Sequence, residues 1–407
     1  MRNERRTLAG SPLSILRDSG FLRVWAIGLL GNTMRWLELL AIGIYVFETT
    51  GSALLVAVMT IARQAPLALF GTFIGTYAER ANRKYLLASG FVVMTMSSGT
   101  MGLLATLGVA EIWHLVLGVF VNGTCWALDF PVRRTLLGDF AGPERLGQGF
   151  SIDSATNNAT RMAGPFAGGV IYGLIGLQGA FAVSAVTHFL AAVIALSIVF
   201  RHSRAAAAPE PFIARLREGL AIVRRSPELI GIYFVTIILN VFGFPYTAMV
   251  PVLGRARYEV EPALVGLLSA SEGAGAFVGA LIITFVVRSS WFKRLYLYGA
   301  TVLMIGVFSL AFAPNYGIAV SILLLAGLGM AGFGAMQSTL ILLLAPPNAR
   351  SRLMSLLSVC IGCAPIGLIN LGLLADWLGA PVALGIVSSI GLVCLATVVI
   401  LIPQVRR

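Results

Sequence analysis

Charged side chains lie inside long apolar stretches of this sequence, and they are the residues with the clearest capacity for chemistry. An ionised side chain at the centre of a bilayer is costly, so each one needs either a partner or a function. Carboxylates in such surroundings can bind and release protons, and guanidinium groups can bind anions or neutralise the carboxylates. These residues include both positively and negatively charged side chains. They are Arg35, Glu38, Arg63, Asp129, Asp153, Arg161 and Glu272.

Arg35 and Glu38 are three residues apart and therefore share one face of a helix. Two interpretations of this pair stay open. The two residues could neutralise each other and only allow the segment to enter the membrane. Alternatively, Glu38 could bind a proton in one conformation and release it in another, with Arg35 or Arg63 modulating its proton affinity. Glu38 is therefore a candidate for proton coupling.

Asp153 and Arg161 belong to a second polar strip. Together with Asn157, Gly164 and Gly168 they fall at helical spacing within a narrow arc, which indicates a wet or protein-facing surface. Arg161 could pair with Glu38 or bind an anionic group of a substrate. Asp153 is a further candidate for proton coupling.

Glu272 has no basic neighbour within its own apolar stretch. Either it meets Arg161 or Arg63 from another part of the chain, or it is protonated at rest. We expect a role in coupling or substrate binding.

Polar and aromatic residues elsewhere in the apolar stretches could line a cavity for an amphipathic molecule, although each could equally be packing, as we expect for His188. The complete set of candidate cavity residues is Arg35, Arg63, Asn122, Trp126, Arg161, Asn240, Tyr246 and Gln337.

The sequence contains no combination of residues that is typical of a catalytic site. It has no nucleotide-binding loop, metal-ligand cluster or nucleophile motif, so we expect neither an enzyme, a cofactor nor a metal. Cys360 and Cys363 lie three apart without a nearby histidine or carboxylate, and packing explains them better than metal binding.

The composition requires a membrane. Of 407 residues, 58% are hydrophobic and 11% are charged, whereas a soluble domain carries about 25% charged residues. The apolar stretches are continuous rather than alternating, which favours helices, and each is long enough to cross a hydrocarbon core of about 30 Å. The predicted spans are 24–47, 52–78, 84–108, 112–131, 147–174, 178–200, 227–249, 260–287, 293–313, 316–344, 350–374 and 380–402.

The net charge of +12 does not indicate nucleic-acid binding, because the basic residues have a regular placement. Lys and Arg gather in every second gap between the apolar stretches, and also before the first stretch and after the last. This positive-inside pattern predicts a multi-pass protein of the inner (cytoplasmic) membrane with both termini in the cytoplasm. The first stretch is too long for a cleavable signal peptide and is interpreted as a signal anchor.

Internal repetition divides the chain. Residues 71–84 resemble 279–293, and residues 143–176 resemble 347–379, with an offset of about 200 residues in both cases. The predicted organisation is an N-terminal six-helix bundle over 1–200, a cytoplasmic linker over 201–226 and a C-terminal six-helix bundle over 227–407. The linker contains an amphipathic segment that we expect to lie on the cytoplasmic face.

The connection after the second predicted span carries the most specific motif, which consists of Gly75, Glu79, Arg80, Arg83 and Lys84. Its spacing resembles a loop of the major facilitator superfamily, and the resemblance extends over essentially the whole chain. Glu79 replaces the usual Asp, and Asn82 replaces a usual Gly. Because Asn tolerates a left-handed backbone, we expect the turn to survive.

The resemblance implies the major facilitator fold, an all-α membrane protein with twelve transmembrane helices in two pseudo-symmetric six-helix bundles. Spans three, six, nine and twelve have no charged residue in their interiors, as is typical of the lipid-facing helices of this fold. The motif loop would tie neighbouring helices together in one conformation and release them in the other. Asp129, near Arg133 at the inner end of span four, is expected to contribute to this gate.

The fifth span reads Gly164-Pro165-Phe-Ala-Gly168-Gly169 and resembles an element of the antiporter branches of the superfamily. The glycines permit close helix approach, and Pro165 frees a carbonyl group and bends the helix, so this segment is a candidate hinge. Ordinary small-residue packing is the alternative. The segments around Asp129 and Asn157 resemble the enterobactin-exporter and macrolide-efflux branch, although span four lacks the mid-helix Arg of many proton-coupled drug exporters.

We therefore expect a secondary active transporter, monomeric in the bilayer, whose partners are protons and a small molecule. The favoured activity is proton-coupled export of drug-like or siderophore-like amphipathic molecules by alternating access. A proton-coupled importer of the same fold and an inert membrane receptor are the alternatives.

Overall fold

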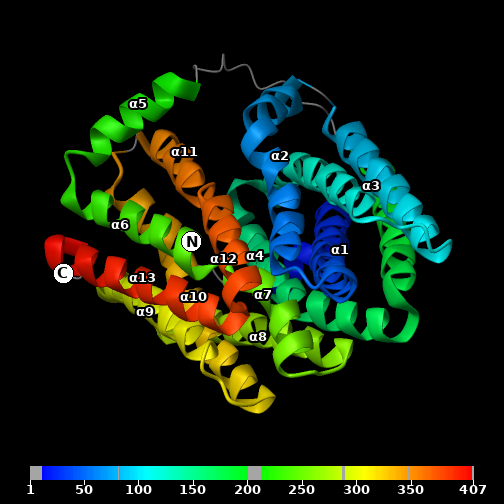
Figure 1. Cartoon of the computed structure of the whole chain (residues 1–407). Coiled ribbons are helices and arrows are strands. Elements are labelled where there is room, and N and C mark those ends of the chain that lie inside the picture. The colour runs from blue at the N-terminus through cyan, green and yellow to red at the C-terminus, as the bar shows by residue number, and fades with distance from the viewer. Residues whose placement is uncertain (1–11, 81, 200–211, 287–288, 347–348, 406–407) are drawn as a thin grey trace.

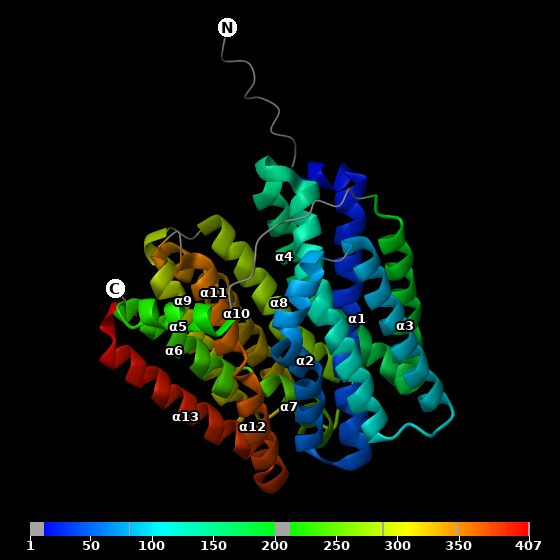
Figure 2. The same cartoon turned by 90° about the horizontal axis from the view of Figure 1, so that it is seen from above.

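The computed structural model describes residues 12–80, 82–199, 212–286, 289–346 and 349–405, and within these ranges the regular structure is entirely helical. Figures 1 and 2 show two bundles side by side, α1 to α4 in one and α6 to α13 in the other. Continuous helices satisfy every backbone hydrogen bond within the segment, which is the requirement that a lipid environment imposes.

The N-terminal half begins with a short 3₁₀ turn (Pro12–Arg17) and contains the helices α1 (Ser19–Thr50), α2 (Ala53–Arg80), α3 (Arg83–Thr106) and α4 (Ile112–Leu196). The 85 residues of α4 are interrupted at Gly142 and Gly176, whose φ angles of 70° and 79° only glycine adopts without strain. We therefore describe α4 as three spanning segments, the first over 112–141, the second over 143–175 and the third over 177–196.

The C-terminal half contains α6 (Pro227–Ile238), α7 (Tyr246–Val252), α8 (Pro262–Val286), α9 (Phe292–Leu310), α10 (Tyr316–Leu344), α11 (Arg350–Ile361), α12 (Ala364–Leu378) and α13 (Ala380–Leu401). Turns of π-helix at Leu239–Gly243 and Leu253–Arg257 make α6 and α7 parts of one span, and α11 and α12 form another. Each half thus has six spanning segments, and the predicted fold class is confirmed.

The internal repeat is visible in the backbone. Gly379, between α12 and α13, has a φ of 85° and occupies the place in its half that Gly176 occupies in the other. Both glycines connect the fifth and sixth spans of their halves.

Side-chain caps fix several helix starts. Asp18 accepts hydrogen bonds from the backbone N–H groups of Gly20 and Phe21, both at 2.9 Å. Asn82 does the same for Lys84 at 3.1 Å and has a φ of −70°. The chain thus turns from α2 into α3 as expected, but Asn82 acts as the N-cap of α3 and does not use the left-handed backbone on which that expectation rested.

The amphipathic segment of the predicted linker forms helix α5 (Phe212–Val223), and linker residues before it lie outside the described ranges. Glu218 of α5 pairs with Arg352 of α11 at 2.9 Å, so α5 rests against the C-terminal half. The exact domain boundaries stay a prediction.

Contacts between the halves concentrate on one side of the bundle. We call the side of the α2–α3 connection and Gly142 the terminal side, and the side of Gly51 and Gly176 the opposite side. On the opposite side, Asp376 of α12 accepts hydrogen bonds from the backbone N–H of Ala53 at 2.6 Å and the hydroxyl of Ser52 at 2.8 Å. An ion pair between Glu48 and Arg255 at 2.8 Å lies on the same side.

The two halves approach most closely where α4 meets α8. The Cβ of a larger residue at Gly169 would collide with the backbone at Pro262 and Gly266, and one at Gly273 would lie 2.9 Å from the backbone N of Met162. From Pro262 to Gly273 this contact follows α8 for about 17 Å at 1.5 Å per residue. It begins at the opposite side and ends at the cavity described next.

Candidate functional site

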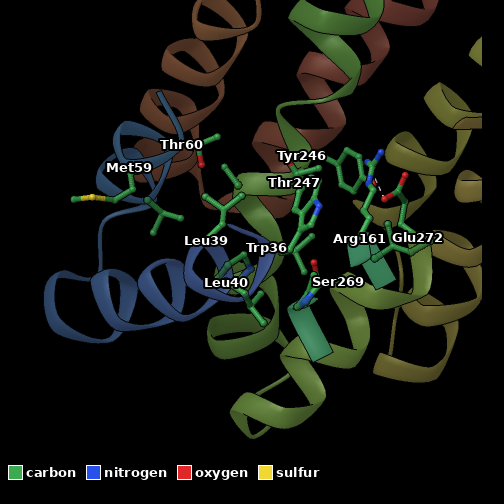
Figure 3. A pocket seen from close by; sticks show the side chains of 16 residues that line it. Trp36, Leu39, Leu40, Met59, Thr60, Arg161, Tyr246, Thr247, Ser269 and Glu272 are labelled. Carbon is green, nitrogen blue, oxygen red and sulfur yellow. Dashed lines mark ion pairs between the residues drawn. The ribbon is translucent and has the colours of Figure 1, made fainter. Parts of the chain in front are cut away.

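A cavity lies between the two halves and is lined by residues of both (Figure 3). Its wall combines apolar side chains with a few polar ones. The described lining consists of Trp36, Leu39, Leu40, Val56, Met59, Thr60, Arg161, Pro165, Tyr246, Thr247, Ala248, Val250, Pro251, Ser269, Glu272 and Leu323.

An ion pair crosses this cavity from one half to the other. Arg161, on the second segment of α4, lies 2.9 Å from the carboxylate of Glu272 on α8. Their side chains are 15% and 6% exposed, so the attraction is little screened by water. Of the two partners expected for Glu272, the structure selects Arg161. The alternative pairing of Arg161 with Glu38 is not formed.

Trp36 of α1 contributes an aromatic wall between cations. The guanidinium group of Arg161 lies 5.4 Å from the centre of its ring, and that of Arg35 lies 5.2 Å away. Arg35 also stacks on Trp126 at 3.9 Å, a close cation–π contact. Arg35 and Trp126 therefore flank Trp36, but neither is among the residues of the described lining.

Several polar atoms at the cavity have no hydrogen-bond partner among the described residues. They are the indole nitrogen of Trp36, the hydroxyl of Tyr246 and one carboxylate oxygen of Glu272. A buried polar atom without a partner costs free energy, so each of these atoms can still accept or donate a hydrogen bond. Together they offer donors and an acceptor within an apolar wall.

A second polar cluster lies inside the N-terminal half. Glu38 pairs with Arg63 of α2 at 3.2 Å, rather than with Arg35 as the spacing suggested. Its carboxylate also accepts hydrogen bonds from Ser98 of α3 at 2.8 Å and from Asn122 of α4 at 3.2 Å. Glu38 is 1% exposed and is separate from the described cavity lining. Arg63 and Asn122, expected at the cavity, belong to this cluster instead.

A third cluster joins the first and second segments of α4, which meet at Gly142 on the terminal side. Arg133 is 2% exposed and pairs with both Asp129, at 3.4 Å, and Asp153. Its guanidinium group packs against Gly28 of α1, where any larger residue would collide with it. Asp129 thus pairs with Arg133 four residues further along the same helix, and its expected contribution to the gate stays a prediction. Asp153 is held by the same arginine and is not a residue of the cavity.

Asn240 and Gln337 lie within the C-terminal half rather than at the cavity. Asn240 donates a hydrogen bond to the backbone carbonyl of Thr236 at 2.9 Å, and Gln337 donates one to its hydroxyl at 3.0 Å. The hydroxyl of Tyr296 also contacts Thr236, so these polar groups satisfy one another. Among the uncharged candidates, only Tyr246 lines the cavity described here.

The Gly-Pro segment of the second α4 segment packs tightly against two helices. A Cβ at Gly164 would lie 2.9 Å from the carbonyl oxygen of Thr33 on α1, and one at Gly168 would lie 2.7 Å from that of Leu37. Gly169 faces α8, and Pro165 borders the cavity. The backbone leaves helical angles at Gly142 and Gly176 rather than at Pro165. Close approach is thus present, and the hinge role stays a prediction.

The motif loop is only partly described. Gly75, Glu79 and Arg80 lie in the last turns of α2, and their side chains are outside the described part of the structure. Arg83 forms an ion pair with Asp139 of α4 at 2.7 Å, and Lys84 lies beside the ring of Tyr85. Arg83 therefore ties α3 to the first segment of α4 on the terminal side.

The sequence reasoning missed Trp36, Ser98 and His188. His188 was assigned to packing, but its ring lies beside Ser98 and hence next to Glu38. A signal was present, because a histidine in an otherwise apolar span is uncommon in the same way as the charged residues that were singled out. Trp36 directly follows Arg35, and only the rotation of α1 shows that it faces the other half.

Comparison with known proteins agrees with this architecture. A family model described as transmembrane secretion effector matches residues 10–406. Macrolide efflux protein A of Streptococcus pyogenes is 22% identical over 395 residues, which cover 95% of this chain and 96% of the relative. The staphyloferrin A transporter of Staphylococcus aureus is 19% identical over 377 residues, which cover 91% of each chain.

Solved structures share the fold at low sequence identity. A bacterial homologue of the lysosomal transporter Spinster, in an inward-facing and unoccupied conformation, superposes with a TM-score of 0.72 at 14% identity and covers 98% of this chain and 96% of its own. A bacterial homologue of the iron transporter ferroportin, in an inward-facing state, gives a TM-score of 0.70 at 16% identity, with 97% and 99% covered.

Proposed function

Because this chain belongs to the transmembrane secretion effector family of the major facilitator superfamily, we propose that it exports small amphipathic molecules in exchange for protons. The observation that carries the proposal is the cavity between the halves, in which an apolar and aromatic wall surrounds the Arg161–Glu272 ion pair. A drug-like or siderophore-like molecule matches such a wall because it presents both apolar surface and polar groups.

Binding would use the unpaired polar atoms of the cavity. A ligand acceptor would receive hydrogen bonds from Trp36 or Tyr246, and a ligand donor would bind the free oxygen of Glu272. The indole of Trp36 would stack against planar or apolar parts of the molecule. Glu272 would thus contact both the substrate and Arg161, and binding or protonation at Glu272 would loosen a contact that joins the halves.

Transport would proceed by rocking of the halves around this cavity. The described conformation has its tight contacts on the opposite side, where Asp376 caps α2 and α4 packs on α8. If the positive-inside prediction holds, the opposite side is external, and this conformation receives substrate from the cytoplasm. The names of the macrolide and staphyloferrin A relatives support small amphipathic substrates, and the efflux names support export.

A disulfide across the opposite side should stop transport. A Cβ at Gly372 of α12 would lie 3.2 Å from the Cβ of Ala57 on α2 and 2.9 Å from the Cα of Leu54. A cysteine there requires a small outward shift of α12, which would bring the two Cβ atoms toward the separation of about 3.5–4.5 Å found in disulfides. The pair Ala57→Cys and Gly372→Cys, with the four native cysteines replaced by alanine, should cross-link in membranes and lose transport. A reducing agent should restore it. Each single cysteine variant is the control, and full transport by the cross-linked protein would contradict rocking at this contact.

The proposed function is tested by the accumulation of compounds in cells. Cells that express the wild-type protein are compared with cells that express Glu38→Gln, using a panel that includes macrolides and siderophores, with and without an uncoupler. We expect lower accumulation of at least one compound in wild-type cells, and reversal by the uncoupler. Higher, uncoupler-sensitive accumulation would identify an importer instead, and no difference for any compound would overturn the proposal.

A further inference from the structure

The Glu38 cluster contains a titratable group that the proposed cavity does not use. Nδ1 of His188, on the third segment of α4, lies 3.4 Å from the hydroxyl oxygen of Ser98. The same hydroxyl donates a hydrogen bond to Glu38 at 2.8 Å. Imidazole, hydroxyl and carboxylate therefore form a continuous row that joins α4, α3 and α1.

We propose that Glu38, Ser98 and His188 form one proton-binding site, in which Ser98 passes a proton between the imidazole and the carboxylate. This inference rests on the proposed function, because it supplies the proton site of the exchange. It adds two groups to the proposed function. One is the imidazole of His188, which lies outside the cavity, and the other is the hydroxyl of Ser98, which relays the proton.

The proton balance follows from the donors available. A serine hydroxyl carries a single hydrogen and can accept others, so it donates to one neighbour while it accepts from the second. With ionised Glu38 and protonated His188, Nδ1 donates to Ser98 and Ser98 donates to Glu38. Transfer along the row leaves neutral His188 and protonated Glu38, with both hydrogen bonds reversed. Loading the site takes one proton from water and makes the cluster, counted with Arg63, singly positive.

The surroundings of the imidazole favour this role over packing. Its ring lies 6.1 Å from that of Phe91, so it packs against α3 on this side. The charged groups that face it are Glu38 from α1 and Arg63 from α2. Asn122 of the first α4 segment adds an amide that contacts both Glu38 and Ser98. A phenylalanine would fill the same apolar space but could not extend the row.

The site is closed in the described conformation. Glu38, Ser98 and His188 are between 0% and 2% exposed, and their cluster with Arg63 and Asn122 joins five spanning segments of one half. A proton held there cannot leave without a relative movement of these segments. Proton-coupled transport requires such an occluded site, because the proton must be released only after the two halves have rocked into the other conformation.

Infrared spectroscopy of the purified protein in lipid vesicles, titrated with pH alone, tests this inference without a transport substrate. We expect a protonated-carboxyl band that is lost in Glu38→Gln and an imidazole band that is lost in His188→Gln. In the wild type both bands should change over the same pH interval. Ser98→Ala removes only the hydroxyl and should separate the two intervals.

His114→Gln is the matched control, because His114 lies at the start of α4 beside Trp113 and far along the chain from the row. It should leave both bands unchanged. An identical pH course of the carboxyl band in wild type, His188→Gln and Ser98→Ala would overturn the inference, as would the absence of any band lost in Glu38→Gln. Coordinated bands in a protein that moves no compound of the panel would refute the transport proposal and retain the proton site.

Discussion

Replacement of Glu272 by glutamine is expected to abolish uncoupler-sensitive transport while the protein remains folded and inserted. Glutamine has nearly the same shape but cannot ionise, so Arg161 would lose its counter-charge across the cavity. Breaking one partner of a buried ion pair costs about 3–5 kcal/mol. A free-energy change of about 1.4 kcal/mol alters an equilibrium constant tenfold. The equilibrium constant between the conformations with this contact formed and broken should therefore change by a factor on the order of 100 or more.

The measurement is the uncoupler-sensitive accumulation of a compound that the wild type exports. Glu261→Gln is the control, because it makes the same chemical change at an exposed position immediately before α8. The double variant Arg161→Gln and Glu272→Gln separates two roles. If the pair is only structural, removing both charges should restore transport. If Glu272 couples protons or binds substrate, the double variant should stay inactive. Wild-type transport by Glu272→Gln across the pH range would exclude Glu272 from the mechanism.

The largest loss of stability is expected for Arg133→Met. Asp129 and Asp153 are each 8% exposed, and Arg133 is the cation that contacts both of them. Without it, two buried carboxylates would face each other, and the free energy of unfolding should fall by about 3–5 kcal/mol. The measurement is unfolding of the purified protein in mixed micelles with increasing SDS.

Arg134→Met is the neighbouring control, because Arg134 is exposed and lies over the rings of Phe130 and Phe150. Its removal should change stability by less than about 1 kcal/mol, as expected for an exposed cation–π contact. Adding Asp129→Asn and Asp153→Asn to Arg133→Met should recover most of the lost stability. A triple variant as unstable as the single one would show that Arg133 acts through packing rather than charge.

The spans were predictable because membrane insertion depends on the average property of about 20 consecutive residues. The predicted span 316–344 coincides with α10, and most others agree within a few residues. The repeat was also readable, and Gly176 and Gly379, which end corresponding segments of the two halves, both have a positive φ. The set of ionisable residues within the membrane likewise required only the sequence.

The partners of those residues required the tertiary structure. Spacing along one helix placed Arg35 next to Glu38, but the rotation of α1 turns Glu38 toward Arg63 and leaves Arg35 on Trp126. Such a choice depends on how neighbouring helices pack, and the partners are far apart in the sequence, as Ser98 and Glu38 are at 60 residues and Ser98 and His188 at 90.

The sequence by itself determined that this chain is a helical membrane protein of two related halves, with charges that call for pairing or function. Only the tertiary structure shows how those charged residues are grouped. Arg161 and Glu272 pair between the halves, and Glu38 and Arg63 pair within the N-terminal half. Arg133 joins Asp129 and Asp153 toward the terminal side. The physical reason is that burial in lipid is a property of each segment taken separately. Pairing is instead a property of several segments at once, and it is settled only when glycine contacts such as those between α4 and α8 fix the distance and rotation of the helices.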